Sequence, residues 1–222
     1  NVIEEVKDNV RRLRSHPCVA LYCGNNEMEV ALNNWGWETT YDWEEKDIQE
    51  IRKGYKELFE TRIPEELYLL TKTNYTSTSP LSNWGTPENF NHSSMHYWGV
   101  WHGKEPIENF KNNVPRFMVE YGFQSFPNYE TLQNWIKLEE LSLTSETIKN
   151  RQKSYIGNGL ILDHIRASGK DPITFQEFVE MSQEVQADAL KTAIKAHRLA
   201  KGHCMGTMFW QLNDCWPGPS WS

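Results

Sequence analysis

Short apolar runs that alternate with helical patterns are the feature that most constrains the fold of this chain. Apolar runs of strand type occur at 18–23, 67–70, 95–101, 116–120 and 206–212. Helical periodicity opens the chain from residue 2 and covers 44–60, 105–113 and, at greatest length, 174–200. Short strands that alternate with helices are typical of parallel βαβ units. The sequence therefore predicts an α/β fold with parallel strands.

The number of strands predicts part of a barrel. A closed (β/α)8 barrel needs eight strands and typically about 250 residues. With strands near residues 18, 67, 95, 116 and 207, the 222 residues would hold about five of the eight βα units, the C-terminal part of a TIM barrel. We expect an incomplete segment over 1–222 that lacks the first three strands, with an irregular insertion over 124–172.

The charge and the aromatic content narrow the classes of partner. Lys and Arg number 23 against 30 Asp and Glu, and the net charge of −7 disfavours nucleic acid and anionic lipid. No apolar run approaches the ~18 residues of a membrane span. Aromatic residues make up 13% of the chain, and many stand among Asn, Ser, Gly and His, which suggests an aromatic surface that faces a polar ligand such as a sugar.

Glutamates follow two of the predicted strands. The run at 18–23 leads into Gly24-Asn25-Asn26-Glu27, and the run at 116–120 ends in Glu120. The carboxyl ends of parallel barrel strands open onto one face, so these two side chains could meet there. Two facing carboxyl groups can cleave a glycosidic bond, because one protonates the leaving oxygen while the other attacks or activates water.

Three motifs resemble the catalytic barrel of β-mannosidases of glycoside hydrolase family 2. They are Gly24-Asn-Asn-Glu27, Glu120-Tyr-Gly-Phe-Gln-Ser-Phe-Pro127 and Trp210-Gln-Leu-Asn-Asp-Cys-Trp-Pro-Gly-Pro-Ser-Trp221. The resemblance extends over essentially the whole chain and implies that Glu27 is the general acid/base and Glu120 the nucleophile. It implies a retaining, exo-acting enzyme that removes terminal non-reducing β-D-mannose from an oligosaccharide substrate through a covalent glycosyl-enzyme.

Further residues are candidates for binding the substrate. Related hydrolases use an asparagine at the position of Asn26 to bind the sugar's 2-hydroxyl. By their positions in the resembling family, Trp35, Trp84 and Trp210 look like walls of the subsite for the reacting sugar. Trp101 and His102 belong to the third predicted strand and its following loop, which suits a hydroxyl contact. We expect Tyr97 to point into the core, and Asn213 and Asp214 to cap the last strand.

Neither a metal nor a cofactor is expected. His92, His96 and His102 fall close together in sequence, but they share no helix face and no Cys or carboxylate completes a ligand set at familiar spacing. The cysteines form no C-x-x-C motif, and we expect buried thiols. The resemblance likewise implies hydrolysis without a cofactor.

Other functions remain open at this point. The chain could belong to another family 2 exo-glycosidase, namely a β-galactosidase, β-glucuronidase or exo-β-glucosaminidase, or be a non-catalytic carbohydrate-binding remnant. The resemblance also implies flanking β-sandwich domains in the same full-length chain and an extracytoplasmic compartment, which would be periplasmic, secreted or lysosomal.

Overall fold

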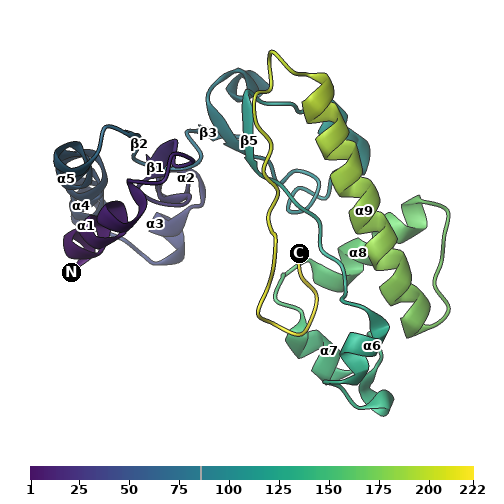
Figure 1. Ribbon diagram of the computed structural model, residues 1–222. Helices are drawn as coiled ribbons and strands as arrows, with labels where there is room; N and C mark the ends of the chain where they lie inside the picture. The colour runs from purple at the N-terminus through teal and green to yellow at the C-terminus, as the bar shows by residue number, and fades with distance from the viewer. Residues whose placement is uncertain (86) are drawn as a thin grey trace. The chain divides into compact units, whose positions relative to one another are not determined.

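The computed structural model describes residues 1–85 and 87–222 and divides into two compact units, 1–83 and 84–222 (Figure 1). Both units mix helices with short strands, so the α/β prediction is confirmed at that level. Each unit has its own cluster of buried apolar side chains.

The first unit carries a parallel strand pair. Its elements are α1 (Val2–Leu13), β1 (Leu21–Cys23), α2 (Met28–Asn34), α3 (Trp37–Thr40), α4 (Glu45–Tyr55), α5 (Ile63–Leu70), β2 (Asn74–Thr76) and β3 (Ser82–Asn83). Strands β1 and β2 pair in parallel, with Tyr22 opposite Tyr75. The helices between them supply the crossover that a parallel pair requires.

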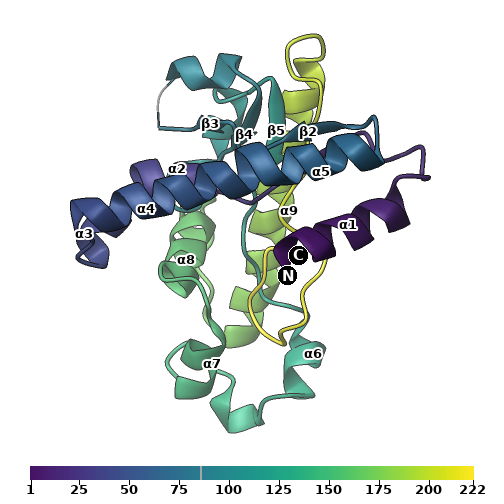
Figure 2. The same cartoon turned by 90° about the vertical axis from the view of Figure 1, so that its left-hand side faces the viewer.

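A continuous helical rod replaces one predicted strand. Helix α4, the π-helical turn Lys56–Arg62 and α5 follow one another without a break (Figure 2). The expectation of a strand at 67–70 was wrong, because these residues form the end of α5, and the second strand follows at β2. Pro64 and two glutamates stand in the first turn of α5, and Ile63 and Leu67 bury the same helix face against α1.

The second unit is built around a long helix. Its elements are the 3-10 turn Pro87–Asn91, β4 (Ser94–His96), the 3-10 turn Ile107–Lys111, β5 (Phe117–Glu120), α6 (Tyr129–Gln133), the 3-10 turn Leu138–Glu140, α7 (Glu146–Arg151), α8 (Gly157–Ala167) and α9 (Phe175–Leu199). The prediction of a helix over 174–200 is confirmed. Thr174 begins it with a reciprocal capping box, in which its hydroxyl accepts from the Glu177 N–H and the Glu177 carboxylate accepts from the Thr174 N–H.

The insertion between β5 and α9 is more regular than predicted. Three helices, α6, α7 and α8, lie within 124–172, so the expectation of an irregular segment was wrong. Figures 1 and 2 show α8 beside α9. Ile161 and Ile165 on α8 are fully buried in the core of the unit, and this burial explains why the segment is helical.

Strands β4 and β5 pair in parallel, and the segment after α9 runs along the other side of β5. The Met205, Met208 and Trp210 amides donate to carbonyl groups of 116–121. The predicted strand at 206–212 is reduced to a single bridge between Met118 and Thr207. The four residues from Met118 to Tyr121 face the three from Met208 to Trp210, and such a bulge interrupts a regular ladder.

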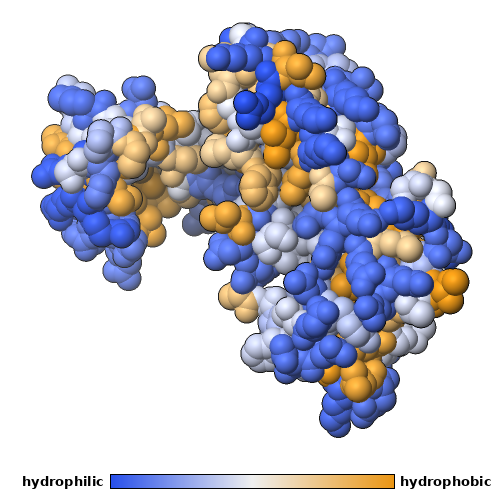
Figure 3. Space-filling view, turned by 45° about the vertical axis from the view of Figure 1, so that its right-hand side comes forward, coloured by the Kyte–Doolittle hydropathy of each residue, from blue (hydrophilic) through white to orange (hydrophobic). Residues whose placement is uncertain are grey.

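Three of the four cysteines lie on the surface. All four thiols are free, but only Cys204 is buried, so the expectation of buried thiols was wrong for Cys18, Cys23 and Cys215. The face shown in Figure 3 is mostly hydrophilic, with separate hydrophobic patches. Among the described residues, no helix combines the length and the apolar character that crossing a bilayer requires.

One buried histidine should make the stability depend on pH. His197 on α9 packs edge-on against Tyr121, its Nδ1 lies 2.8 Å from the Thr207 hydroxyl, and burial lowers its pKa from 6.5 to about 4. Between these two values the unfolded chain binds a proton that the folded chain does not. The free energy of unfolding should therefore fall as the pH drops from 6.5 to 4, by up to ~1.4 kcal/mol for each pH unit.

Replacement of His197 with Gln should make that slope shallower, as measured by urea unfolding at several pH values, while His164, whose pKa burial also lowers, keeps a slope of the same sign. The same replacement at the exposed His16 is the control and should leave the slope in place. An equal slope in the wild type and H197Q would contradict the assignment.

Candidate active site

Glu120 ends β5 at the point where the neighbouring strand also ends. Its partner in the parallel register is His96, the last residue of β4, after a shift between Met95 and His96. The side chain of Glu120 is 13% exposed, and that of His96 is 2% exposed. A carboxylate with so little contact with water needs hydrogen-bond donors nearby.

Ring nitrogens of His96, at the end of β4, and of Trp98, two residues later, approach the Glu120 carboxylate. His96 Nδ1 lies 3.3 Å from Glu120 Oε2, and the Trp98 indole N–H donates to the same oxygen across 3.3 Å. His96 and Trp98 stand two residues apart, which puts them on the same side of an extended chain. The carboxylate of Glu120 is thus held through one oxygen by the neighbouring chain segment.

Tyr97, between these two residues, links residues 96–98 to β5 and to the core of the unit. Its backbone N–H donates to the Glu120 carbonyl oxygen across 2.8 Å. Its ring is buried edge-on against Trp84, Phe90 and Phe110, which confirms that it points into the core. The phenol bonds to the Glu105 carboxylate and accepts from the Asn113 amide at 2.8 Å. Burial, together with the bond to Glu105, raises the pKa of the Tyr97 phenol.

The glycine after Glu120-Tyr121 allows a close approach of the last motif. A Cβ added at Gly122 would come within 2.2 Å of the Trp210 carbonyl oxygen, so any side chain there would displace the backbone. The Trp210 N–H donates to the Tyr121 carbonyl oxygen at 2.8 Å. Trp210 is 42% exposed, and its cis peptide bond leads into Gln211. The motif therefore brings an accessible indole next to the end of β5.

Aromatic rings continue from Glu120 toward α8. The Trp98 ring meets His102 edge-on at 5.4 Å and Trp221 edge-on at 6.3 Å between centroids. His102 is exposed and stacks on Tyr155 at 5.6 Å, and its Nδ1 lies 3.1 Å from the Tyr155 hydroxyl. The predicted binding residue His102 is thus linked to Glu120 through Trp98.

Trp101 does not fit a binding role. Its side chain is fully buried, packs edge-on against Phe123 and Trp221, and donates its indole N–H to Ser154. A substrate could not reach this ring, so the prediction that Trp101 contacts the substrate was wrong. Trp84 is partly buried against Tyr97 at the edge of the same core.

In the first unit, Glu27 stands in a turn that Asn25 organises. The Asn25 amide donates to the Ser77 carbonyl at 2.7 Å, and its oxygen accepts from the Met28 N–H and the Thr78 hydroxyl. Glu27 adopts a left-handed conformation, with φ of 59°, directly before α2. Such a φ is uncommon outside glycine and is often found at functional sites.

The neighbouring predicted residues are accessible. Asn26 is exposed and forms a parallel bridge with Ser79, and the Glu27 N–H donates to the Ser79 carbonyl at 2.7 Å. Trp35, directly after α2, is 48% exposed. The turn of Glu27, the exposed Asn26 and the accessible Trp35 therefore lie on consecutive parts of one short segment.

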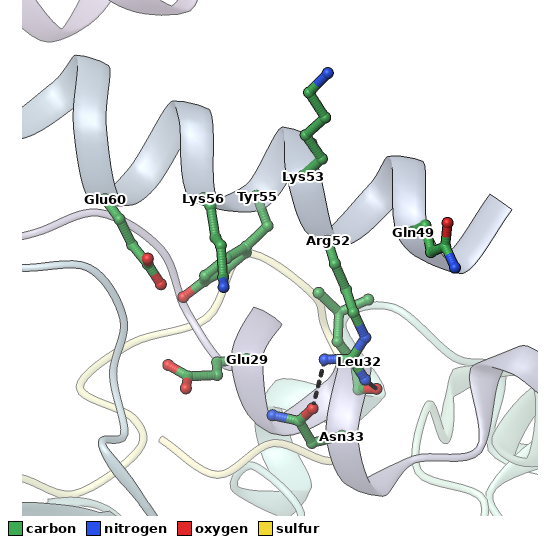
Figure 4. A pocket seen from close by; sticks show the side chains of 9 residues that line it. All are labelled: Glu29, Leu32, Asn33, Gln49, Arg52, Lys53, Tyr55, Lys56 and Glu60. Atoms are coloured by element: carbon green, nitrogen blue, oxygen red, sulfur yellow. Dashed lines mark hydrogen bonds between the residues drawn. The ribbon is translucent and has the colours of Figure 1, made fainter. Parts of the chain in front are cut away.

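A cavity of about 460 Å³ lies between α2 and the rod that begins with α4 (Figure 4). Most of the residues that line it are charged or polar, among them Glu29 and Asn33 on α2 and Arg52 on α4. The Arg52 guanidinium donates to Asn33 at 2.9 Å and to the Leu32 carbonyl at 3.2 Å. These bonds fix the end of α2 against α4.

The three histidines considered as metal ligands have separate surroundings. His96 faces Glu120, His102 stacks on Tyr155, and His92 is exposed beyond the 3-10 turn Pro87–Asn91.

Asp214 accepts from the N–H groups of Cys215 and Trp216 and from the Ser220 hydroxyl, and so shapes its own turn.

Sequence reasoning missed two residues of the site. His96 was considered only as a metal ligand, although its place two residues before Trp98 is a signal that both face one neighbouring strand. Asn25 was treated only as part of a motif, although an Asn three residues before a helix residue is a typical partner for that residue's N–H.

Comparisons with known proteins agree on one enzyme type. The chain is 32% identical over 245 aligned residues to the "Beta-mannosidase" of Bos taurus and 29% identical over 231 to the "Beta-mannosidase B" of Aspergillus terreus. Each alignment covers 100% of this chain and 27% of the relative. The crystal structure of the β-D-mannosidase from Dictyoglomus thermophilum matches 99% of this chain and 26% of its own, with a TM-score of 0.82 and 31% identity. No family model matches the chain.

Removal of the Tyr97 hydroxyl should lower stability. Tyr97→Phe leaves the Glu105 carboxylate and the Asn113 amide without this partner inside the unit. The expected loss in the free energy of unfolding is about 1–3 kcal/mol, measured by denaturant unfolding. Tyr129→Phe is the control, because the Tyr129 ring packs on Phe175 at the edge of the same core. A loss no larger than that of the control would show that the network contributes nothing.

Proposed function

This chain belongs, as a segment, with the β-mannosidases of glycoside hydrolase family 2, and on that premise we propose that the protein containing it hydrolyses β-mannosides. The chain spans about 27% of the length of the curated relatives it matches, so the activity is assigned to the full-length protein. The substrate we propose is an oligosaccharide with terminal non-reducing β-D-mannose, from which one sugar is removed at a time.

We assign the two catalytic roles to the glutamates of the motifs. Glu120 attacks the anomeric carbon and forms a glycosyl ester while Glu27 donates a proton to the leaving oxygen. In the second step Glu27 accepts a proton from water, the water oxygen bonds to the anomeric carbon, and the ester bond to Glu120 breaks. Two displacements at one carbon retain its configuration.

The observation that supports Glu120 as the nucleophile is the contact of two ring nitrogens with its Oε2 atom. Both the His96 ring and the Trp98 indole meet that oxygen, so the neighbouring chain segment orients the carboxylate. A nucleophile that is oriented before the substrate arrives loses little further entropy on reaction. Such an arrangement suits a residue that forms a covalent bond at one defined carbon.

The parallel strand pairs support a barrel as the setting of this chemistry. Strands β1 with β2 and β4 with β5 are parallel, and Glu27 and Glu120 each follow the carboxyl end of such a strand. We propose that 1–222 form the C-terminal part of a (β/α)8 barrel and that the first three strands and flanking β-sandwich domains belong to the same full-length chain. Catalytic residues of such barrels stand at the carboxyl ends of strands.

The pocket residues we retain are those with accessible or adjacent side chains. Asn26 would bind the 2-hydroxyl, Trp35 and Trp210 would cover apolar faces of the sugar, and His102 would contact a hydroxyl. Trp84 remains a candidate at the edge of the core. We further propose an extracytoplasmic compartment and catalysis without a metal or a cofactor, as the resemblance implies.

Loss of the nucleophile should abolish turnover. In the full-length protein, Glu120→Ala should lower kcat on nitrophenyl β-mannoside by more than about a thousandfold, because no ester can form. The wild type should prefer the β-mannoside over the β-galactoside and the β-glucuronide. A preference for another sugar would favour the alternative family 2 enzymes, and an inert wild type would favour a non-catalytic carbohydrate-binding protein.

Loss of the acid/base should depend on the leaving group. Glu27→Ala should lower kcat/KM by about 10²–10⁴-fold on substrates with poor leaving groups and by much less on activated aryl mannosides. Azide should restore turnover and yield β-mannosyl azide, because it attacks the ester without needing a base. Proton NMR of the product identifies the anomer, and an α-azide or no rescue would contradict the role of Glu27.

A further inference from the structure

Four aromatic rings form an accessible cluster directly after α2. The cluster consists of Trp35, Trp37, Tyr41 and Trp43, and every ring touches another one. The Trp37 ring meets the other three edge-on at 5.5–6.4 Å between centroids, and Tyr41 stacks on Trp43 at 5.8 Å. Trp35 is 48% exposed and Tyr41 is 60% exposed. Exposed aromatic surface of this extent marks a binding site more often than chance.

The backbone builds this cluster with two sharp turns. Gly36 has a φ of 65° between Trp35 and Trp37, and Asp42 has a φ of 50° between Tyr41 and Trp43. The first of these turns suits glycine, and the second is uncommon for a residue with a side chain. The turns gather rings that a regular helix would spread around its axis. The rings are therefore in place before a ligand arrives.

The composition of the segment points to a neutral sugar as the ligand. Residues 33–43 contain Asn, Trp, Gly, Glu, Thr, Tyr and Asp, with no aliphatic residue and no Lys or Arg. Flat rings cover the apolar C–H faces of pyranoses, and amides, hydroxyls and carboxylates bind their hydroxyl groups. The two acidic residues repel anionic ligands, and the segment lacks the Met and Arg side chains that protein interfaces favour beside aromatic residues.

The position of the cluster along the chain favours the leaving-group side of the substrate. Helix α2 separates Glu27 from Trp35, and its seven residues rise by about 10 Å. That length exceeds one pyranose ring and is comparable to a short oligosaccharide. The general acid stands next to the oxygen that leaves, so sugars beyond that oxygen extend on the side of Glu27.

We propose that Trp37, Tyr41 and Trp43 bind the sugar units of the leaving group, so that the enzyme prefers manno-oligosaccharides over mannosides with short aglycones. This inference rests on the proposed function and extends it to the substrate class. Arg52 supports the arrangement, because its bonds to Asn33 and Leu32 hold the end of α2 from which the cluster begins.

Kinetics on substrates of different length test the inference in the full-length protein. For Tyr41→Ala and Trp43→Ala, kcat/KM on β-1,4-mannotriose should fall by about fivefold to tenfold, as expected for one lost ring contact. On β-mannosyl fluoride, whose leaving group is a single atom, both variants should stay within about twofold of the wild type. Tyr68→Ala removes a tyrosine of α5 that is 73% exposed, and it is the matched control.

Three outcomes would overturn the inference. Unchanged rates on mannotriose would show that the rings do not bind it, and equal losses on both substrates would place them at the reacting sugar. A lower melting temperature with unchanged rates would show that another part of the protein covers the cluster.

Failure of the proposed function is distinguishable from these outcomes, because the wild type would then hydrolyse neither substrate. Calorimetric titration of mannotetraose into E120Q, with and without Tyr41→Ala, then tests sugar binding without turnover. Weaker binding in the double variant supports the site, and equal binding overturns it.

Discussion

The structure of the candidate site depends on the contacts that residues 96–98, at and after the end of β4, make with Glu120. The Trp98 indole N–H and the His96 Nδ1 both reach one carboxylate oxygen, and the intervening Tyr97 amide reaches the carbonyl oxygen of the same residue. A carboxylate that is mostly shielded from water costs free energy unless donors replace the lost water. The parallel register of β4 and β5 brings these groups to Glu120, so the geometry of the candidate site depends on the strand pairing.

The donors are in turn fixed by packing on the opposite side of the strand. Tyr97 points away from Glu120 into a core of edge-on rings, and its phenol is tied to Glu105 and Asn113. Successive side chains of an extended chain point to opposite sides, so neighbouring residues have different roles here. His96 and Trp98 face the carboxylate, while Tyr97 resists any displacement of the segment that carries them.

The sequence predicted regular patterns of several residues better than short apolar runs and the surroundings of single side chains. The α/β class, the helix over 174–200 and the strand that ends in Glu120 were recognisable, because each has a periodicity or a cap that acts over several residues. The apolar run at 67–70 was read as a strand, although Pro64 and the pair Ile63 and Leu67 favour a helix. Trp101 could not be told from an accessible tryptophan by sequence, because its burial depends on Phe123 and Trp221, which are distant along the chain. The pairing of Glu27 with Glu120 remains a prediction.

Residues 96–98 contact both the main chain and the side chain of Glu120, and this has a consequence for how related proteins could diverge and be engineered. Residues 96–98 and the end of β5 at Glu120 form one structural module. The stretch from Asn33 to Trp43 is a separate surface segment, called here the attachment. New specificities could therefore arise by exchange of the attachment alone, and a protein engineer could graft other loops there while leaving the module intact.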